Sequence, residues 1–307
     1  MFPLSYAFPD ELVVADVPNK DRVWAEVIPG FRETYRFGPG QQADYFEQYR
    51  RARFAFTWRK GGWDCLRHYE ILANGCIPVF RDLDSCPAAT LASFPKTLVL
   101  EAMRDLLPWS GAKAALYDDY VARMLRHARK RLTCSASTRS FLERFGLPRA
   151  AHRILVLRCH KSVNYTREML LIGLKRMHEC VEFPRIPYLY DDYPIERLGE
   201  CAGNGFGYAR LLQAPPYPWT RRSIRDSIRA REWDLIVYGK MGVGERRQGT
   251  VPRCPFWADV SAVYAPEEIA FLYGGDACQD RADPGSPHTV HLRSHSELGR
   301  CFVRELV

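Results

Sequence analysis

The sequence predicts an α/β protein of two domains, residues 1–150 and 151–307, and three observations lead to this fold class. At 307 residues the chain is long enough for two domains of ordinary size. Apolar segments typical of strands alternate with segments of helical periodicity in both halves. Such alternation is typical of parallel sheets covered by helices on both faces. The stretch Gly-Leu-Pro at 146–148 is the predicted linker.

The clearest unit of the first half is a predicted β-α-β unit between Phe54 and Phe80. Its helix is expected to begin after an N-cap at Asp64. The helix should end at Gly75, where a C-terminus favours a left-handed residue. The unit contains, in order, a buried strand at 54–58, a glycine turn at 60–62, the helix and a strand at 76–80.

The other expected elements follow the same periodicity rules. Those of the first half are a strand at 11–15, a helix at 44–53, a short strand at 97–100, and one or two helices over 117–145 with an interruption near 133–137. Those of the second half are a strand at 153–158, a helix at 166–180, a short extended segment at 181–183, a loop at 213–219, a helix at 223–232, and strands at 234–238 and 268–273.

Composition and charge exclude several classes of protein. No apolar run approaches the ~20 residues that span a bilayer, and no signal peptide is recognisable, so a cytoplasmic location is expected. The ten cysteines are scattered without a CxxC pair, which favours reduced, buried thiols over a zinc site or a disulfide framework. The net charge of +8 is divided between the halves, with 22 Lys and Arg against 17 Asp and Glu in residues 1–150 and 22 against 19 in residues 151–307.

A basic cluster at 123–131 is the densest group of positive charges in the chain. A nucleic-acid module concentrates its charge on one face, whereas the excess here is spread over both halves. We therefore interpret the cluster as the solvated face of a helix and expect no nucleic-acid partner. Binding that falls steeply with salt would favour the opposite interpretation.

The turn at 60–62 is the first candidate binding feature. Gly61 and Gly62 allow backbone N–H groups to approach an anion, and the dipole of the following helix points its positive end to the same place. Lys60 and His68 are close enough in sequence to add donors. These four residues are predicted to bind the phosphates of a substrate.

Three polar residues share one face of the predicted helix. Arg67, Glu70 and Asn74 stand at i, i+3 and i+7. An arginine there can meet a diphosphate, and a glutamate can accept hydrogen bonds from two hydroxyls of a ribose or a sugar. The alternative, an amphipathic helix whose polar face meets only solvent, is equally compatible with the spacing.

The string from Arg67 to Phe80, Arg-His-Tyr-Glu-Ile-Leu-Ala-Asn-Gly-Cys-Ile-Pro-Val-Phe, resembles the donor-binding signature of exostosin-like glycosyltransferases. Its flanks at 35–49, 86–87 and 94–96 are also similar to the donor half of these enzymes. The resemblance implies two Rossmann-like domains facing a cleft, the GT-B type. It further implies that Glu70 contacts a nucleotide-sugar and that basic residues nearby hold its diphosphate.

The order of the halves departs from that family. In two-Rossmann transferases the acceptor half usually precedes the donor half, whereas the donor-like half comes first here. The tail at 298–306 looks like a connector that would run into residues 3–8. A permuted order, or an excerpt from a longer tandem protein, predicts that Met1 and Val307 lie close together near the hinge.

The second half offers polar strand ends, where open α/β sheets bind ligands. An inverting sugar transfer needs a base near the acceptor hydroxyl, and His160 and Asp276 are the candidate catalytic residues. Lys161 and Lys240 are the candidate substrate contacts. The alternatives are that His160 is a capping or packing residue and that Asp276 forms a turn. The glycine loop at 203–207 is a weaker candidate.

These features together predict a glycosyltransferase that moves a sugar from a nucleotide-sugar donor to a glycan or another hydroxyl acceptor. The alternative is a nucleotide-sugar or carbohydrate-binding protein without a competent base. No cofactor and no metal are expected, although Asp82 and Asp84 follow the strand at 76–80 and leave a metal possible.

Overall fold

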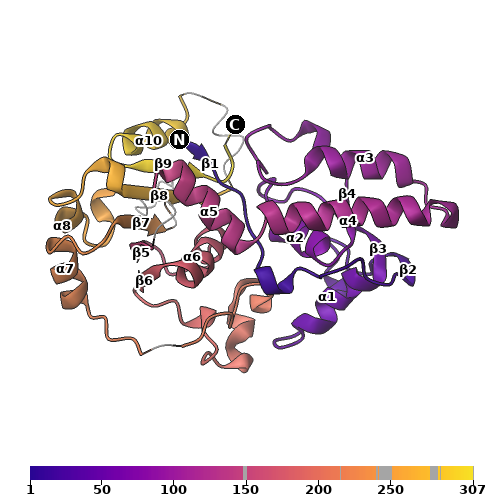
Figure 1. The fold of residues 1–307 in the computed structure, drawn as a ribbon, viewed down its shortest axis with the longest axis horizontal. Coiled ribbons are helices and arrows are strands. Elements are labelled where there is room, and N and C mark those ends of the chain that lie inside the picture. Colours follow the sequence, from indigo (N-terminus) through magenta and orange to yellow (C-terminus); the bar gives the residue numbers. More distant parts are fainter. Residues whose placement is uncertain are drawn as a thin grey trace.

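The chain forms one six-stranded and one three-stranded parallel sheet with helices between and around them (Figure 1). The computed structural model describes residues 1–147, 151–214, 216–239, 241, 251–276, 283 and 285–306. The orange and yellow strands of the larger sheet lie on the left of Figure 1, and the purple strands of the smaller sheet lie on the right. The mixed α/β class and parallel sheets predicted from the sequence are confirmed, and both sheets are consistent with Rossmann-like domains.

The larger sheet has the strand order β1-β9-β8-β7-β5-β6, and every pairing in it is parallel. Without its edge strand β1, this order is the flavodoxin-like 2-1-3-4-5 arrangement of a doubly wound sheet. The strands are β1 (Phe2–Pro3), β5 (Arg153–Arg158), β6 (Glu179–Phe183), β7 (Leu235–Gly239), β8 (Ile269–Tyr273) and β9 (Arg300–Val303).

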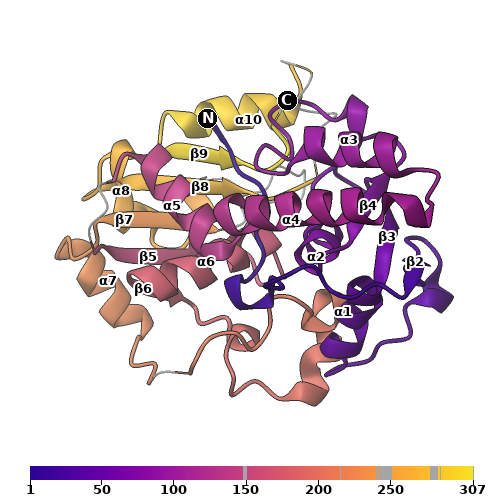
Figure 2. The same cartoon turned by 45° about the vertical axis from the view of Figure 1, so that its right-hand side comes forward.

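Alternate residues of these strands enter two different hydrophobic clusters, so the sheet is covered on both faces. Ile154 and Val156 pack into the cluster that includes α5 (Cys134–Phe145) and α6 (Tyr165–Met177), the two helices in front of the sheet in Figure 2. Leu155 and Leu157 pack into the other cluster, which includes α7 (Arg221–Arg229), α8 (Trp257–Ser261) and α10 (Pro287–Ser296).

The smaller sheet has the order β2-β3-β4 and carries the predicted β-α-β unit. Its strands are β2 (Arg22–Trp24), β3 (Ala52–Thr57) and β4 (Ile77–Phe80), and its helices are α1 (Gln42–Arg51), α2 (Leu66–Ala73), α3 (Lys96–Leu106) and α4 (Ala114–Arg131). Gly75 has the expected positive φ of 65° after α2. The predicted interruption between α4 and α5 is present, with Thr133 as the N-cap of α5.

Three predictions of local structure are wrong. Residues 97–100 belong to helix α3 instead of a strand, because Val99, Ala102 and Leu106 are buried at helical spacing and a short apolar run fits either element. Residues 11–15 form no strand, and a 3-10 turn at Asp10–Leu12 includes the first two of them. The N-cap of α2 is Cys65, while the Asp64 carboxylate accepts a hydrogen bond from the backbone N–H of Tyr6.

The two ends of the chain meet in the larger sheet. Phe2 pairs with Phe302 across β1 and β9, so part of the expected connector at 298–306 is a strand. Val307 lies outside the described residues, and the permuted order stays a prediction, as does the division at residue 150. Within the described ranges, no helix is both long and apolar enough to cross a bilayer.

Candidate functional site

One pocket has a volume of about 710 Å³, within the range of small-molecule sites. It takes its lining from both halves of the sequence: the turn that follows β3 and the start of α2 on one side, and Tyr165, Asn204 and Asp276 on the other. Of the predicted site residues, it brings together Lys60, Gly61, Gly62, Arg67, Glu70 and Asp276. It is therefore the candidate active site.

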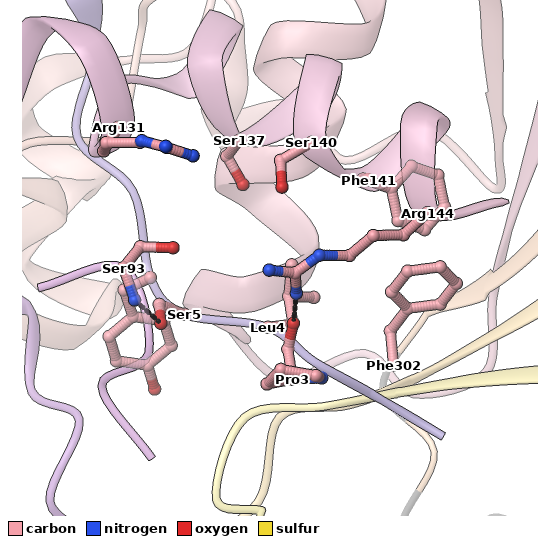
Figure 3. A pocket seen from close by; sticks show the side chains of 11 residues that line it. Pro3, Leu4, Ser5, Ser93, Arg131, Ser137, Ser140, Phe141, Arg144 and Phe302 are labelled. Carbon is pink, nitrogen blue, oxygen red and sulfur yellow. Dashed lines mark hydrogen bonds between the residues drawn. The ribbon is translucent and has the colours of Figure 1, made fainter. Parts of the chain in front are cut away.

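A second hollow lies between the N-terminal segment and α5, and it is too small to hold a substrate (Figure 3). Ser137 and Ser140 of α5 and the side chains of Arg131 and Arg144 point toward it. The Arg144 guanidinium donates a hydrogen bond to the carbonyl of Pro3. Its volume of about 10 Å³ holds no more than a single water molecule.

Glu70 is a buried acid of the pocket. It lies on the second turn of α2 with 6% of its surface exposed, and its Oε2 accepts a hydrogen bond of 2.8 Å from the Tyr45 hydroxyl. Burial raises the pKa of the Glu70 carboxyl to about 7, against the opposing effects of Tyr45 and of the Arg67 charge. At neutral pH this group is poised between an acceptor and a donor of hydrogen bonds.

Arg67 stands one helical turn before Glu70 and supplies a cation with unused donors. Its guanidinium carbon lies 5.5 Å from the ring centroid of Tyr35, a cation–π contact. Its Nε and Nη1 atoms are buried and have no hydrogen-bond partner. A buried N–H without an acceptor costs about 1–3 kcal/mol, and an anionic group in the pocket would remove this cost.

The glycine turn is already occupied by an anion from the protein itself. The Glu305 carboxylate accepts hydrogen bonds from the backbone N–H of Asp64 at 2.9 Å and of Trp63 at 3.2 Å. A Cβ on Gly62 would lie only 2.5 Å from Glu305 Oε1. The expectation that the turn's donors are open to a phosphate is therefore wrong for these two N–H groups. The first turn of α2, at Leu66 and Arg67, lines the pocket instead.

Asp276 follows strand β8 and lies against the same turn. A Cβ on Gly61 would be 2.5 Å from its Oδ2, and the side chain keeps 51% of its surface exposed. The other oxygen, Oδ1, pairs with the Arg304 guanidinium. The second-half base candidate thus lies directly beside the predicted donor residues.

Arg304 ties this acidic cluster together. It is 1% exposed, and its Nη1 donates to Glu305 Oε1 at 2.9 Å and to the carbonyl of Asp64. Its Nε donates to the carbonyl of Gly274 at 3.0 Å, and its guanidinium stacks 4.7 Å from the ring centroid of Tyr6. Burial raises the pKa of the neighbouring Asp64 carboxyl to about 7, opposed mainly by the Arg304 charge.

Two predicted substrate contacts prove to be structural. His68 is fully buried, with Nδ1 2.8 Å from the Thr57 hydroxyl and Nε2 2.9 Å from the Trp63 carbonyl, and burial lowers its pKa to about 3. Asn74 is the buried C-cap of α2, and it accepts a hydrogen bond from Arg50 Nε at 2.9 Å. Both side chains are used inside the fold, so neither can contact a ligand in the pocket.

The remaining candidates that the structure describes do not line the pocket. His160 and Lys161 follow β5 and are not among the lining residues, and His160 Nδ1 lies 2.7 Å from the Ser162 hydroxyl. Lys240 lies outside the described residues. Asp82 and Asp84 also lie away from the pocket lining. No group of three or more His, Cys, Asp and Glu side chains that could hold a metal ion occurs in the described part of the chain.

Sequence reasoning missed the aromatic wall of the pocket. Tyr35, Phe37 and Tyr45 come from the first half, and Tyr165 and Phe206 come from the second. The rings of Tyr45 and Phe206 stack with centroids 5.3 Å apart across this boundary. The glycine loop at 203–207 contacts this wall, since Asn204 donates a hydrogen bond of 2.7 Å to the carbonyl of Phe37. The high aromatic content of the sequence was the only indication of this wall.

Replacing Glu70 with Gln should make the protein less sensitive to a rise in pH from acidic to neutral. The pKa of Glu70 is higher in the folded state than in the unfolded state, so its contribution is fully present below pH ~4.5 and is lost as pH rises toward 7. Relative to wild type, Glu70→Gln should therefore gain about 3 kcal/mol of unfolding free energy between pH 4.5 and pH 8. Urea unfolding at several pH values measures this difference.

The matched control for this experiment is Glu143→Gln, which changes an exposed glutamate on α5. This variant should keep a constant offset from wild type over the same pH range. A constant offset for Glu70→Gln as well would show that burial does not perturb the Glu70 carboxyl.

Known proteins give no further guide to this site, because no protein-family model, no curated protein and no solved structure matches the chain.

Proposed function

We propose that the chain is a glycosyltransferase that binds a nucleotide-sugar in the 710 Å³ pocket, in a cleft between two Rossmann-like domains. The observation that carries the proposal is the meeting of Arg67 and Glu70 of α2 with Asp276 from the second half. The resemblance of the α2 segment to exostosin-like transferases assigns the donor to the same residues.

Each group has a role in this proposal. The unpartnered Nε and Nη1 of Arg67 bind the diphosphate, together with Lys60 and the first turn of α2. Glu70 accepts hydrogen bonds from vicinal hydroxyls of the ribose or the sugar, and the aromatic wall packs against the nucleobase of the donor. Asp276 acts as general base toward the acceptor hydroxyl. The reaction is then driven by positioning and by charge stabilisation of the departing diphosphate.

A second candidate function is a nucleotide-sugar or carbohydrate-binding protein without turnover. Two observations favour it: His160 does not line the pocket, and the Asp276 carboxylate already pairs with Arg304. Binding alone requires only Arg67, Glu70 and the aromatic wall.

Nucleoside diphosphates and their sugars should stabilise the protein against heat. A ligand at a hundredfold excess over its Kd adds about 2.7 kcal/mol to the free energy of unfolding. Melting curves with the uridine, guanosine and adenosine diphosphates and their common sugar conjugates measure this effect. Arg67→Met should abolish the shift because it removes the cation but keeps most of the side-chain volume.

The control for the ligand screen is Arg104→Met, which removes an arginine that is 73% exposed on α3. This variant should shift with ligand as wild type does. The absence of a shift with every diphosphate would reject the donor site, and an undiminished shift in Arg67→Met would reject its assignment to the α2 face.

A further inference from the structure

Three sulfur atoms from distant parts of the chain meet on the larger sheet. Cys159 directly follows β5, Met241 comes two residues after the end of β7, and Cys254 precedes α8. Met241 and Cys254 are buried, and Cys159 is half-buried. The proposed glycosyl transfer uses none of these residues, and none of them lines the 710 Å³ pocket.

The three sulfurs form a nearly equilateral triangle. The distances are 3.4 Å between Cys159 Sγ and Cys254 Sγ, 3.8 Å between Cys159 Sγ and Met241 Sδ, and 3.6 Å between Cys254 Sγ and Met241 Sδ. The point equidistant from them is therefore about 2.1 Å from each sulfur, close to the ~2.3 Å of a metal–thiolate bond. An outward shift of about 0.2 Å per sulfur would accommodate a metal ion in this plane.

The chemistry of the ligands selects the metal. Two thiolates and one thioether are soft ligands, which favour Cu(I) over the hard cations that prefer oxygen. A structural Zn²⁺ site takes four ligands in a tetrahedron, whereas the described residues supply a triangle of three. We propose that Cys159, Met241 and Cys254 form a trigonal binding site for a single Cu(I) ion.

The position of the triangle supports a ligand site. In the doubly wound order of the larger sheet, the topological switch point lies between β5 and β7, where the chain turns from one side of the sheet to the other. Ligands of such sheets bind beyond the carboxyl ends of the strands at this point. Cys159 and Met241 follow these two carboxyl ends.

Metal binding at this site displaces protons. Cu(I) binding replaces one proton on each of the two thiols, and both protons go to solvent while the copper keeps its oxidation state. The affinity for Cu(I) should therefore increase with pH.

The test is a titration of the reduced, full-length chain with Cu(I) in competition with the chromogenic chelator bicinchoninate. We expect one Cu(I) per chain, and X-ray absorption of the complex should show three sulfur neighbours at about 2.3 Å. Cys159→Ser and Cys254→Ser should each weaken binding by more than ~100-fold, beyond the usual loss for an outer-shell partner. Met241→Leu, a near-isosteric change, should weaken binding about tenfold.

Cys86→Ser is the matched control, since Cys86 is half-buried like Cys159 but belongs to the first half. It should bind Cu(I) as wild type does. Failure of the wild-type chain to retain copper against the chelator would overturn the proposal. X-ray absorption that shows nitrogen or oxygen neighbours of the copper in place of the three sulfurs would overturn it too. This result comes from the wild-type chain and so does not depend on the folding of any variant.

Discussion

Arg304→Met should lower the free energy of unfolding by about 3–5 kcal/mol, the usual cost of removing one partner from a buried ion pair. Arg304 is the cation shared by Asp276 and Glu305, and its guanidinium also donates to the carbonyl of Asp64. Methionine would remove the ion pair between Arg304 and the fully buried Glu305 carboxylate. Urea unfolding of the variant and of wild type at pH 7 measures the loss.

Arg222→Met is the control for this substitution, because Arg222 is 93% exposed on α7 and lies 3.8 Å from Asp226. Exposed pairs of this kind contribute about 0–1 kcal/mol. If the loss of unfolding free energy in Arg304→Met fell within that range too, the charge of Arg304 would not be what holds the tail at 298–306 to the glycine turn.

Asp276→Asn should reduce sugar transfer by about 10²–10⁴-fold, the usual contribution of a general base. Asparagine keeps the shape of the side chain and can still accept a hydrogen bond from Arg304, but it cannot take a proton from the acceptor. The assay is release of nucleoside diphosphate from whichever nucleotide-sugar stabilises the protein. Donor binding, measured by the thermal shift, should change little, so the loss should fall on kcat.

The control is Glu267→Gln, which changes an exposed side chain near the amino end of β8 and should leave turnover unchanged. Full activity in Asp276→Asn would remove Asp276 as the base. A wild-type protein that binds nucleotide-sugars and turns over none of them would instead favour the binding-protein candidate.

The sequence predicted the parts of the fold that depend on neighbouring residues. Helix α2, Gly75 and the strands around them follow from local periodicity and capping, and the structure confirms them. The run at 97–100 in α3 was misassigned because its three consecutive apolar residues satisfy both periodicities. The edge strand Phe2–Pro3 is too short to leave any pattern.

The site was harder to predict because its decisive contacts join distant residues. Glu305 binds backbone N–H groups 241 and 242 residues away, and no local pattern indicates that a tail carboxylate fills the glycine turn. Helical spacing placed Arg67 and Glu70 in the pocket correctly. The same spacing cannot show that Asn74 is covered by Arg50.

The pairing of β1 with β9 has a consequence for synthesis on the ribosome. Phe302, the partner of Phe2, is made 300 residues after it. At ~5–20 residues per second this interval is about 15–60 s. During that time the growing chain cannot pair β1 with β9, and the segment around Phe2 is where a chaperone would be needed.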